Sequence, residues 1–255
     1  MIALVGNLSR DVLQGKPPRV GGGSYHGARA LHRLRVPARV VARCAAADRD
    51  ALVRPLVRLG TPVRFVASQT TASFRIDYDG DTRRMYVDAL AEPWQPDELP
   101  ALPDGVRWVH VAPLARSDFP PETLAALARR RRLSLDGQGL VRIPREGPLE
   151  LDADYDPELL RHVWILKLSE EEAAILGDPA ALPVREVVVT SGARGATVFT
   201  GGRSEFVPAR GLDTDPTGAG DAFCAAYVVS RGAGFPPVAA ARRATAVVAA
   251  VLSAR

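Results

Sequence analysis

The chain has 255 residues, of which 47% are hydrophobic and 24% charged, with a formal net charge of +4. These values fit one large α/β domain whose core needs no disulfide or metal, and no apolar run reaches the ~18 residues of a membrane span. The N-terminal residues read as a strand and not as a secretory signal. Cys44 and Cys224 lie in apolar, alanine-rich stretches. We therefore expect buried free thiols and a cytoplasmic location.

The positive charge comes almost entirely from arginine, because Lys16 and Lys167 are the only lysines. The densest basic run, residues 129–132, follows an amphipathic stretch, and we interpret it as the solvated end of a helix. No aromatic side chains that could stack on bases are interleaved with it. The sequence therefore predicts neither a nucleic-acid partner nor a membrane partner.

The N-terminal part of the chain alternates between strands and helices. Short apolar runs predict the strands, and an apolar face at helical spacing predicts the helices. Three glycines, Gly21, Gly22 and Gly23, precede the first helix and would allow close approach of the backbone to a ligand, although a plain flexible turn is the alternative. The predicted strands are 2–5, 38–44 and 62–67, and the predicted helices are 25–35 and 50–59.

Residues 73–78 and 83–87 alternate with period two around an Asp-Gly turn, which predicts a β-hairpin. Its faces bear charges and few large aliphatic side chains. We therefore expect a small β lid over a cleft, made from segments at about 9–20 and 70–90, and the alternative is an ordinary edge hairpin.

From residue 106 the strand–helix alternation continues, which favours a mostly parallel sheet flanked by helices in a single domain over residues 1–255. A hairpin is predicted at 196–200 and 205–208, and two stretches, 137–139 and 144–148, read as loop. The strands expected here are 106–111, 133–136, 163–166 and 187–190, with helices at 121–131, 157–160, 169–176, 222–231 and 237–252.

The stretch Gly218-Ala219-Gly220-Asp221 runs directly into an apolar helical pattern. Backbone N–H groups at such a helix start are unpaired, and with the helix dipole they suit an anion such as a phosphoryl group. Asp221 in the first turn could act as a general base for an attacking hydroxyl. The alternative is a turn followed by an N-capping aspartate.

Further polar residues follow predicted strands, where ligands bind in open α/β sheets. Thr190, Gly192 and Gly195 could form a phosphate nest or a plain strand-to-turn connection. Lys167 would face the cleft, and Glu171 could help to order water around a magnesium ion. The alternative for this segment is a helix capped by Ser169, with acids in its first turn.

The motif from Asp215 to Phe223 resembles the C-terminal signature of the ribokinase (PfkB-type) carbohydrate kinase family. Three other segments are similar to that family: the segment from Gly6 to Asp11, the glycines 21–23, and the Thr190–Gly195 loop. Within the family the chain is most similar to the plant myo-inositol kinase type. Shared features include Asp136-x-Gln138 with Arg142, and Lys167 followed by Glu171.

The resemblance implies a ribokinase-like fold and a kinase that uses ATP and Mg²⁺ to phosphorylate a sugar or cyclitol hydroxyl. Asp221 would be the base, and the amides of Gly218, Ala219 and Gly220 would hold the transferring phosphoryl group. The implied substrate-binding residues are Asn7, Asp11, Gly22, Gly23 and His26; the implied cofactor-binding residues are Lys167, Thr190, Gly192, Gly195 and Thr217; and Glu171 would serve the metal.

Two alternatives remain open from the sequence. A nucleoside kinase of the same fold would present an aromatic platform, for which Tyr25, Phe74 and Tyr86 are the candidates. A non-catalytic sensor would bind a sugar or nucleotide without needing Asp221. Family lids also suggest a homodimer formed through the lid. Few residues follow Asp221, so we expect an adenine side that is open, permissive or completed by a partner subunit.

Overall fold

The computed structural model describes residues 1–79, 82–209 and 218–253. Its main sheet has the strand order β14-β13-β12-β11-β9-β8-β1-β4-β5. The strands from β12 to β5 run parallel, and the hairpin β13–β14 adds two antiparallel strands at one edge. The strands are β1 (Ile2–Asn7), β4 (Ala38–Ala45), β5 (Val63–Ser68), β8 (Trp108–Val111), β9 (Arg132–Asp136), β11 (Val163–Ser169), β12 (Glu186–Thr190), β13 (Gly195–Thr200) and β14 (Arg203–Pro208).

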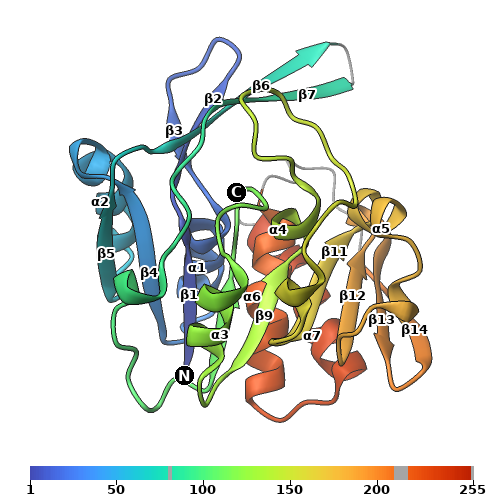
Figure 1. Ribbon diagram of the computed structural model, residues 1–255. Helices are drawn as coiled ribbons and strands as arrows, with labels where there is room; N and C mark the ends of the chain where they lie inside the picture. Colours follow the sequence, from blue (N-terminus) through green and yellow to red (C-terminus); the bar gives the residue numbers. More distant parts are fainter. Residues whose placement is uncertain (80–81, 210–217, 254–255) are drawn as a thin grey trace.

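Helices cover both faces of this sheet (Figure 1). One face packs against α1, α2, α6 and α7, and the other against α3 and α5. The mostly parallel α/β sheet flanked by helices is therefore confirmed. The helices are α1 (Gly23–Arg33), α2 (Arg49–Arg58), α3 (Pro121–Ala128), α4 (Gln138–Val141), α5 (Glu170–Leu176), α6 (Ala219–Gly232) and α7 (Pro237–Ser253).

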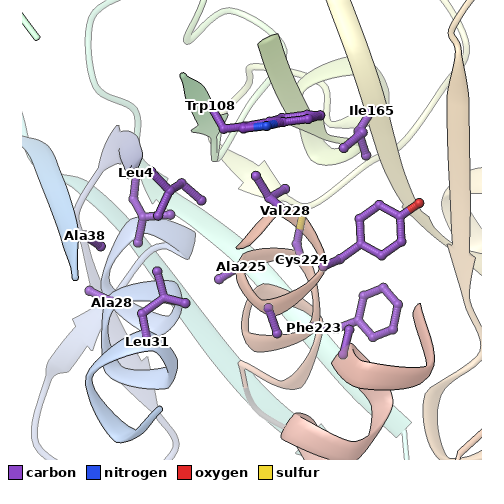
Figure 2. Packing of buried hydrophobic residues seen from close by; sticks show 14 of the residues in the cluster. Leu4, Ala28, Leu31, Ala38, Trp108, Ile165, Phe223, Cys224, Ala225 and Val228 are labelled. Atoms are coloured by element: carbon purple, nitrogen blue, oxygen red, sulfur yellow. The ribbon is translucent and has the colours of Figure 1, made fainter. Parts of the chain in front are cut away.

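The interior strand β1 shows why the sheet is largely apolar. Its side chains alternate between the two faces, so Leu4 joins the core on the α1 and α6 side while Val5 joins the core on the α3 side. Figure 2 shows Leu4 of β1 and Leu31 of α1 facing Ala225 and Val228 of α6. A buried face on each side favours apolar residues along most of the strand, from Ile2 to Val5.

A second, five-stranded sheet has the order β10-β7-β6-β2-β3 and lies above the carboxyl ends of the main strands (Figure 1). It has a small core of its own around Phe74 and Val87, which Leu114 from the main domain completes. The sequence predicted its central hairpin. The strands are β2 (Ser9–Leu13), β3 (Arg19–Gly21), β6 (Ala72–Asp79), β7 (Thr82–Ala89) and β10 (Gly147–Pro148).

Several elements differ from the sequence prediction. Residues 138–141 form the short helix α4 where a loop was expected at 137–139, and the expected loop 144–148 contains strand β10. Helix α3 ends at Ala128, because Arg129 leaves the helical region with a ψ of 110° and Arg130 follows with a left-handed φ of 61°. Strand β11 continues to Ser169, which places Lys167 within the sheet. Within the described ranges, no helix is both long and apolar enough to cross a membrane.

Candidate active site

The site lies at the carboxyl edge of the main sheet, where β9 and β11 end beside the start of α6. Asp136 and Lys167 are direct neighbours in the β9–β11 register. Lys167 Nζ donates to Asp136 Oδ1 at 3.0 Å, and both side chains are buried. Burying either charge alone would be costly, and the attraction between the ammonium and the carboxylate offsets that cost.

The ammonium of Lys167 stays protonated in this setting. Burial lowers the pKa of Lys167, but nearby Asp136 and Glu172 raise it by more, so the net pKa lies above the ordinary lysine value. Gly220 allows Lys167 to approach the first turn of α6, since a Cβ at Gly220 would lie 3.1 Å from Nζ. A positive charge is therefore held at the N-terminus of this helix.

Asp221 occupies the first turn of α6 beside this pair. Burial raises the pKa of Asp221 to about 6, and the charge of Asp136 acts in the same direction. Lys167 and His110 oppose that shift. A carboxylate with a pKa near neutrality can both accept and release a proton at physiological pH, which suits a general base.

The N-terminus of α6 has no side-chain cap. Gly218 precedes it with a φ of 76°, and Ala222 N donates to Gly218 O at 3.0 Å. The first N–H groups of this 14-residue helix have no intrahelical acceptor, so they and the helix dipole favour an anion in front of them. His26 of α1 packs against this turn. The two residues are so close that a Cβ at Gly218 would lie only 2.8 Å from His26 Nδ1.

The glycines that precede α1 bring the N-terminal part of the chain to the same place. A Cβ at Gly23 would lie 2.8 Å from Asp221 Oδ1, and a Cβ at Gly21 would overlap the carboxylate of Asp11. Ser9 Oγ donates to Asp11 Oδ1 at 2.7 Å and orients that carboxylate. The structure therefore brings Asp11, Gly22, Gly23, His26 and Asp221 together at one edge of the sheet.

The structure places Asn7 differently from the sequence expectation. Its side chain is fully buried, and its Oδ1 accepts from Arg43 Nε at 3.2 Å and from Trp94 Nε1 at 2.9 Å. The Arg43 guanidinium also stacks on Trp94, 4.4 Å from the ring centroid. Asn7 therefore faces a buried polar network under the site, because the last residue of β1 turns its side chain inward.

Glu171, which was expected to order water around a magnesium ion, does not face the site. Its side chain is exposed on α5, whereas Glu172 is 7% exposed and lies next to Gly137. Ser169 and Glu172 form a capping box: Ser169 N donates to Glu172 Oε2 at 2.8 Å, and Glu172 N donates to Ser169 Oγ at 3.2 Å. The third helical residue folds back over the helix start, so Glu172 is the acid that faces Lys167 and Asp136.

The predicted phosphate loop lies one strand away, since Ser169 and Thr190 are paired between β11 and β12. Thr190 Oγ1 donates to Leu168 O at 3.0 Å. Gly192 has a φ of 55° and an open surface, whereas Gly195 is buried and a Cβ there would overlap Val207 O. Gly195 therefore shapes the β13–β14 hairpin, and Thr217 lies outside the described residues.

Several site residues received no role from the sequence. Buried His110 on β8 lies 3.5 Å through Nδ1 from Cys224 Sγ, one helical turn after Asp221. Burial lowers the pKa of His110, which favours the neutral ring. Arg142 acts electrostatically on both Asp221 and Glu172. A polar residue inside an apolar strand, such as His110 between Val109 and Val111, is the signal that could have indicated these buried polar residues.

Comparison with known proteins agrees with this geometry. The family model described as pfkB family carbohydrate kinase matches residues 56–255. Inositol 3-kinase from Oryza sativa subsp. japonica is 35% identical over 117 residues, which cover 42% of this chain and 30% of that protein. The match thus spans about a third of the relative's length.

Solved structures are similar over almost the whole chain. A pyrophosphate-dependent kinase in the ribokinase family, in complex with sulfate, is 27% identical with a TM-score of 0.85, covering 99% of this chain and 95% of that one. A pyrophosphate-dependent kinase of the same family, complexed with a pyrophosphate analogue and myo-inositol, is 26% identical with the same TM-score and coverage.

Proposed function

Because the chain belongs to the pfkB family of carbohydrate kinases, we propose that it transfers a phosphoryl group to a hydroxyl of a sugar or cyclitol. The observation that supports this most is the contact between Gly23 and Asp221 at the open start of α6. It supports a site in which the proposed acceptor segment, the proposed base and the open helix terminus meet at one point. Phosphoryl transfer needs these three parts, and a pure binding protein has no need of the base.

In the proposed mechanism, Asp221 accepts the proton of the attacking hydroxyl. Gly22 and Gly23 let the acceptor approach the backbone, and Asp11 accepts hydrogen bonds from its other hydroxyls. The amides of Gly218, Ala219 and Gly220 would stabilise the charge of the transferring group, as oriented donors in a dry site do. The small sheet with Asp11 would act as the lid that excludes water.

The acidic residues behind Asp221 fit a magnesium ion. Asp136 Oδ2 is buried without a partner in the described part of the chain, and Glu172 faces the same cluster. The described residues contain no group of three or more side chains set to hold a metal, so the ion would be held partly through water and donor phosphates. When bound, it would neutralise charge on those phosphates.

The acceptor is proposed to be a sugar or cyclitol and not a nucleoside. Two of the three aromatic side chains expected to stack on a base make other contacts within the protein. Phe74 is 3% exposed in the core of the small sheet, and Tyr86 lies under Arg75, whose guanidinium is 4.7 Å from the ring centroid. The inositol 3-kinase similarity supports the same choice.

Two phosphoryl donors are compatible with the site. ATP is the donor expected from the motif resemblance. Pyrophosphate is favoured by a basic lining: His26, Arg29 and Arg33 surround a small cavity together with Gly218. Cationic side chains at a helix start suit a compact polyphosphate with no base to recognise, and the pyrophosphate-dependent structures support this second candidate.

The test is a product screen with magnesium, in which inositols, hexoses, pentoses and nucleosides are each incubated with ATP or with pyrophosphate. Phosphorylated acceptor is measured by mass spectrometry, so both donors are read in the same way. We expect one sugar or cyclitol to be phosphorylated, and Asp221→Asn to lower turnover about 10²–10⁴-fold.

The matched control is Asp97→Asn, which removes an exposed carboxylate from a short 3₁₀ turn at residues 96–98 and should retain full activity. The donor that gives product identifies the co-substrate. Undiminished turnover in Asp221→Asn would refute the base assignment. Thermal stabilisation by a sugar, without product from any donor, would instead identify a sensor.

A further inference from the structure

A second cavity lies at the opposite edge of the main sheet, where the parallel strands begin. It has a volume of about 860 Å³, within the usual range for small-molecule sites. Its walls come from the first residues of β1, β8 and β9, from the chain after α1, and from the last turn of α6. Figure 1 shows these ends at the bottom of the sheet, beside the label N, with the small sheet at the top.

The rim of this cavity is strongly basic. Five arginines line it, and Asp104 is the one acidic residue among them: Arg107, Arg130, Arg131, Arg132 and Arg231. Arg231 is neutralised by Glu186, with Nη2 to Oε1 at 2.6 Å. In the described part of the chain, no carboxylate forms a salt bridge with the other four arginines.

Two of these arginines are held in place by contacts that leave their charge uncompensated. Arg131 donates to the backbone oxygen of Leu102 at 3.0 Å, and its Nε is buried without a partner in the described residues. Arg132 stacks between Trp108 and Trp164, with its guanidinium 5.4 Å and 4.3 Å from the two ring centroids. Fixed guanidinium groups cost less entropy when they bind an anion.

The turn before β9 adds a third observation. Arg130 has a φ of 61°, a left-handed conformation in which an arginine costs about 1 kcal/mol and which glycine adopts freely. The strained turn places the exposed Arg130 side chain on the rim of the cavity. Stability alone would favour glycine here, so the arginine points to a requirement other than folding.

We propose that this cavity binds a small anion that bears one or more phosphoryl groups. The guanidinium group of arginine matches phosphate geometry, and three guanidiniums without a salt bridge in the described residues line the cavity: Arg107 just before β8, and Arg130 and Arg131 in the turn before β9. The floor is apolar and includes Trp108 and Val228, which Figure 2 shows side by side. The ligand class is thus a phosphorylated metabolite with a carbon skeleton, such as a sugar phosphate or a nucleotide.

This site is separate from the catalytic edge. Helix α6 starts at the proposed catalytic centre and ends at the cavity, and its 14 residues span about 20 Å. The proposal does not depend on the proposed kinase activity, since it uses other residues and can be tested without turnover.

The probe is inorganic tripolyphosphate, followed through the indole N–H signals of the ¹⁵N-labelled protein. The chain has three tryptophans. Trp108 lines the cavity, whereas Trp94 is buried in the Arg43 network near the other edge and reports separately on tripolyphosphate bound at the catalytic edge. We expect the Trp108 signal to shift with saturation, whatever the response of the Trp94 signal.

Arg107→Ala and Arg130→Gly should each weaken the affinity read from the Trp108 signal by about tenfold or more, because each removes a charge-assisted contact. Arg130→Gly should fold at least as stably as the wild type, so its loss of binding cannot be attributed to unfolding. The control Arg203→Ala removes an exposed arginine on edge strand β14 and should bind normally.

Three results would overturn the proposal. The Trp108 signal could remain unchanged at saturating tripolyphosphate, or both cavity variants could bind as the wild type does. Equal weakening by Arg203→Ala would show that net charge and not the cavity attracts the anion.

Discussion

At Asp221, burial and the neighbouring carboxylate of Asp136 both favour the neutral acid. The chemistry proposed for Asp221 requires the ionised form. A base with a pKa of about 6 is ionised in most molecules at pH 7.5, and its conjugate acid can lose the proton again. The local environment thus sets the pH range in which transfer can occur.

This gives a prediction with two measurements. The kcat/KM of the wild type should rise with pH through about 6 and level off above it. The folded pKa lies above the ordinary aspartate value of 3.8, so the carboxyl group of Asp221 lowers stability progressively as the pH rises from about 4 to about 6, and it has no effect below about pH 4. Asp221→Asn should therefore be more stable than the wild type at pH 8, by on the order of 2 kcal/mol, with no difference at pH 4.

Urea unfolding at pH 4, 6 and 8 measures the second part, and a kinetic pH profile measures the first. A variant less stable than the wild type at pH 8 would mean that the ionised carboxylate is stabilised in the fold. A kcat/KM profile without a rise near pH 6 would remove Asp221 from the role of base.

Asn7 provides a second prediction at this scale. Its Oδ1 accepts from two buried donors, on Arg43 and Trp94. Asn7→Ala would leave both without a partner, so we expect a loss of about 2–4 kcal/mol in the free energy of unfolding. The KM for the acceptor should stay within twofold, because the side chain faces the interior. The exposed Gln69→Ala is the control and should change neither quantity. A raised KM at unchanged stability would restore the substrate-binding role.

At the scale of elements, the passage from the small sheet into α1 depends on Gly22. It links β3 to α1 with a φ of 97°, and a Cβ there would overlap the carbonyl oxygen of Asn7. Both the backbone conformation and the close approach require glycine. Gly23 then meets Asp221, so this short link positions one wall of the site against the other.

Gly22→Ala should therefore destabilise the protein by at least about 3 kcal/mol, since conformational strain and a clash with backbone add together. Gly15→Ala is a matched control: Gly15 has a φ of 70°, but a Cβ there would meet nothing within 4 Å. It should cost only about 1 kcal/mol, the conformational part. Urea unfolding of both variants measures the difference, and equal costs would show that the close approach to Asn7 is unimportant.

The elements themselves followed largely from the sequence, because strands buried on both faces require the apolar runs that were visible in it. The errors came from local geometry that periodicity does not report. The helix at 121–131 was expected to run through the arginines, but Arg129 and the left-handed Arg130 leave the helical conformation. The capping box of α5 decides that Glu172 and not Glu171 turns inward, which the spacing of three adjacent glutamates could not show.

For the molecule as a whole, the fold and the position of the site were predictable. Glycines and a carboxylate at strand ends and helix starts have few structural alternatives, so the sequence could place Gly23 and Asp221 at one edge of the sheet, where the structure has them in contact. The buried polar layer of Asn7, Arg43 and His110 was missed or misread, because burial depends on tertiary packing. The cavity at the amino edge was also hidden, since its arginines come from three separate segments of the chain.

The packing of α1 against α6 has a consequence for how the protein is made. Gly27 and Ala225 let the two helices approach closely, with a Cβ at Gly27 lying 3.5 Å from the Ala225 Cβ (the surrounding packing is shown in Figure 2). About two hundred residues separate these partners in sequence, so a ribosome must release α6 before α1 can bury its apolar face. On the proposed mechanism, a partly synthesised chain has the acceptor wall without Asp221, so it would not transfer a phosphoryl group before α6 docks on α1.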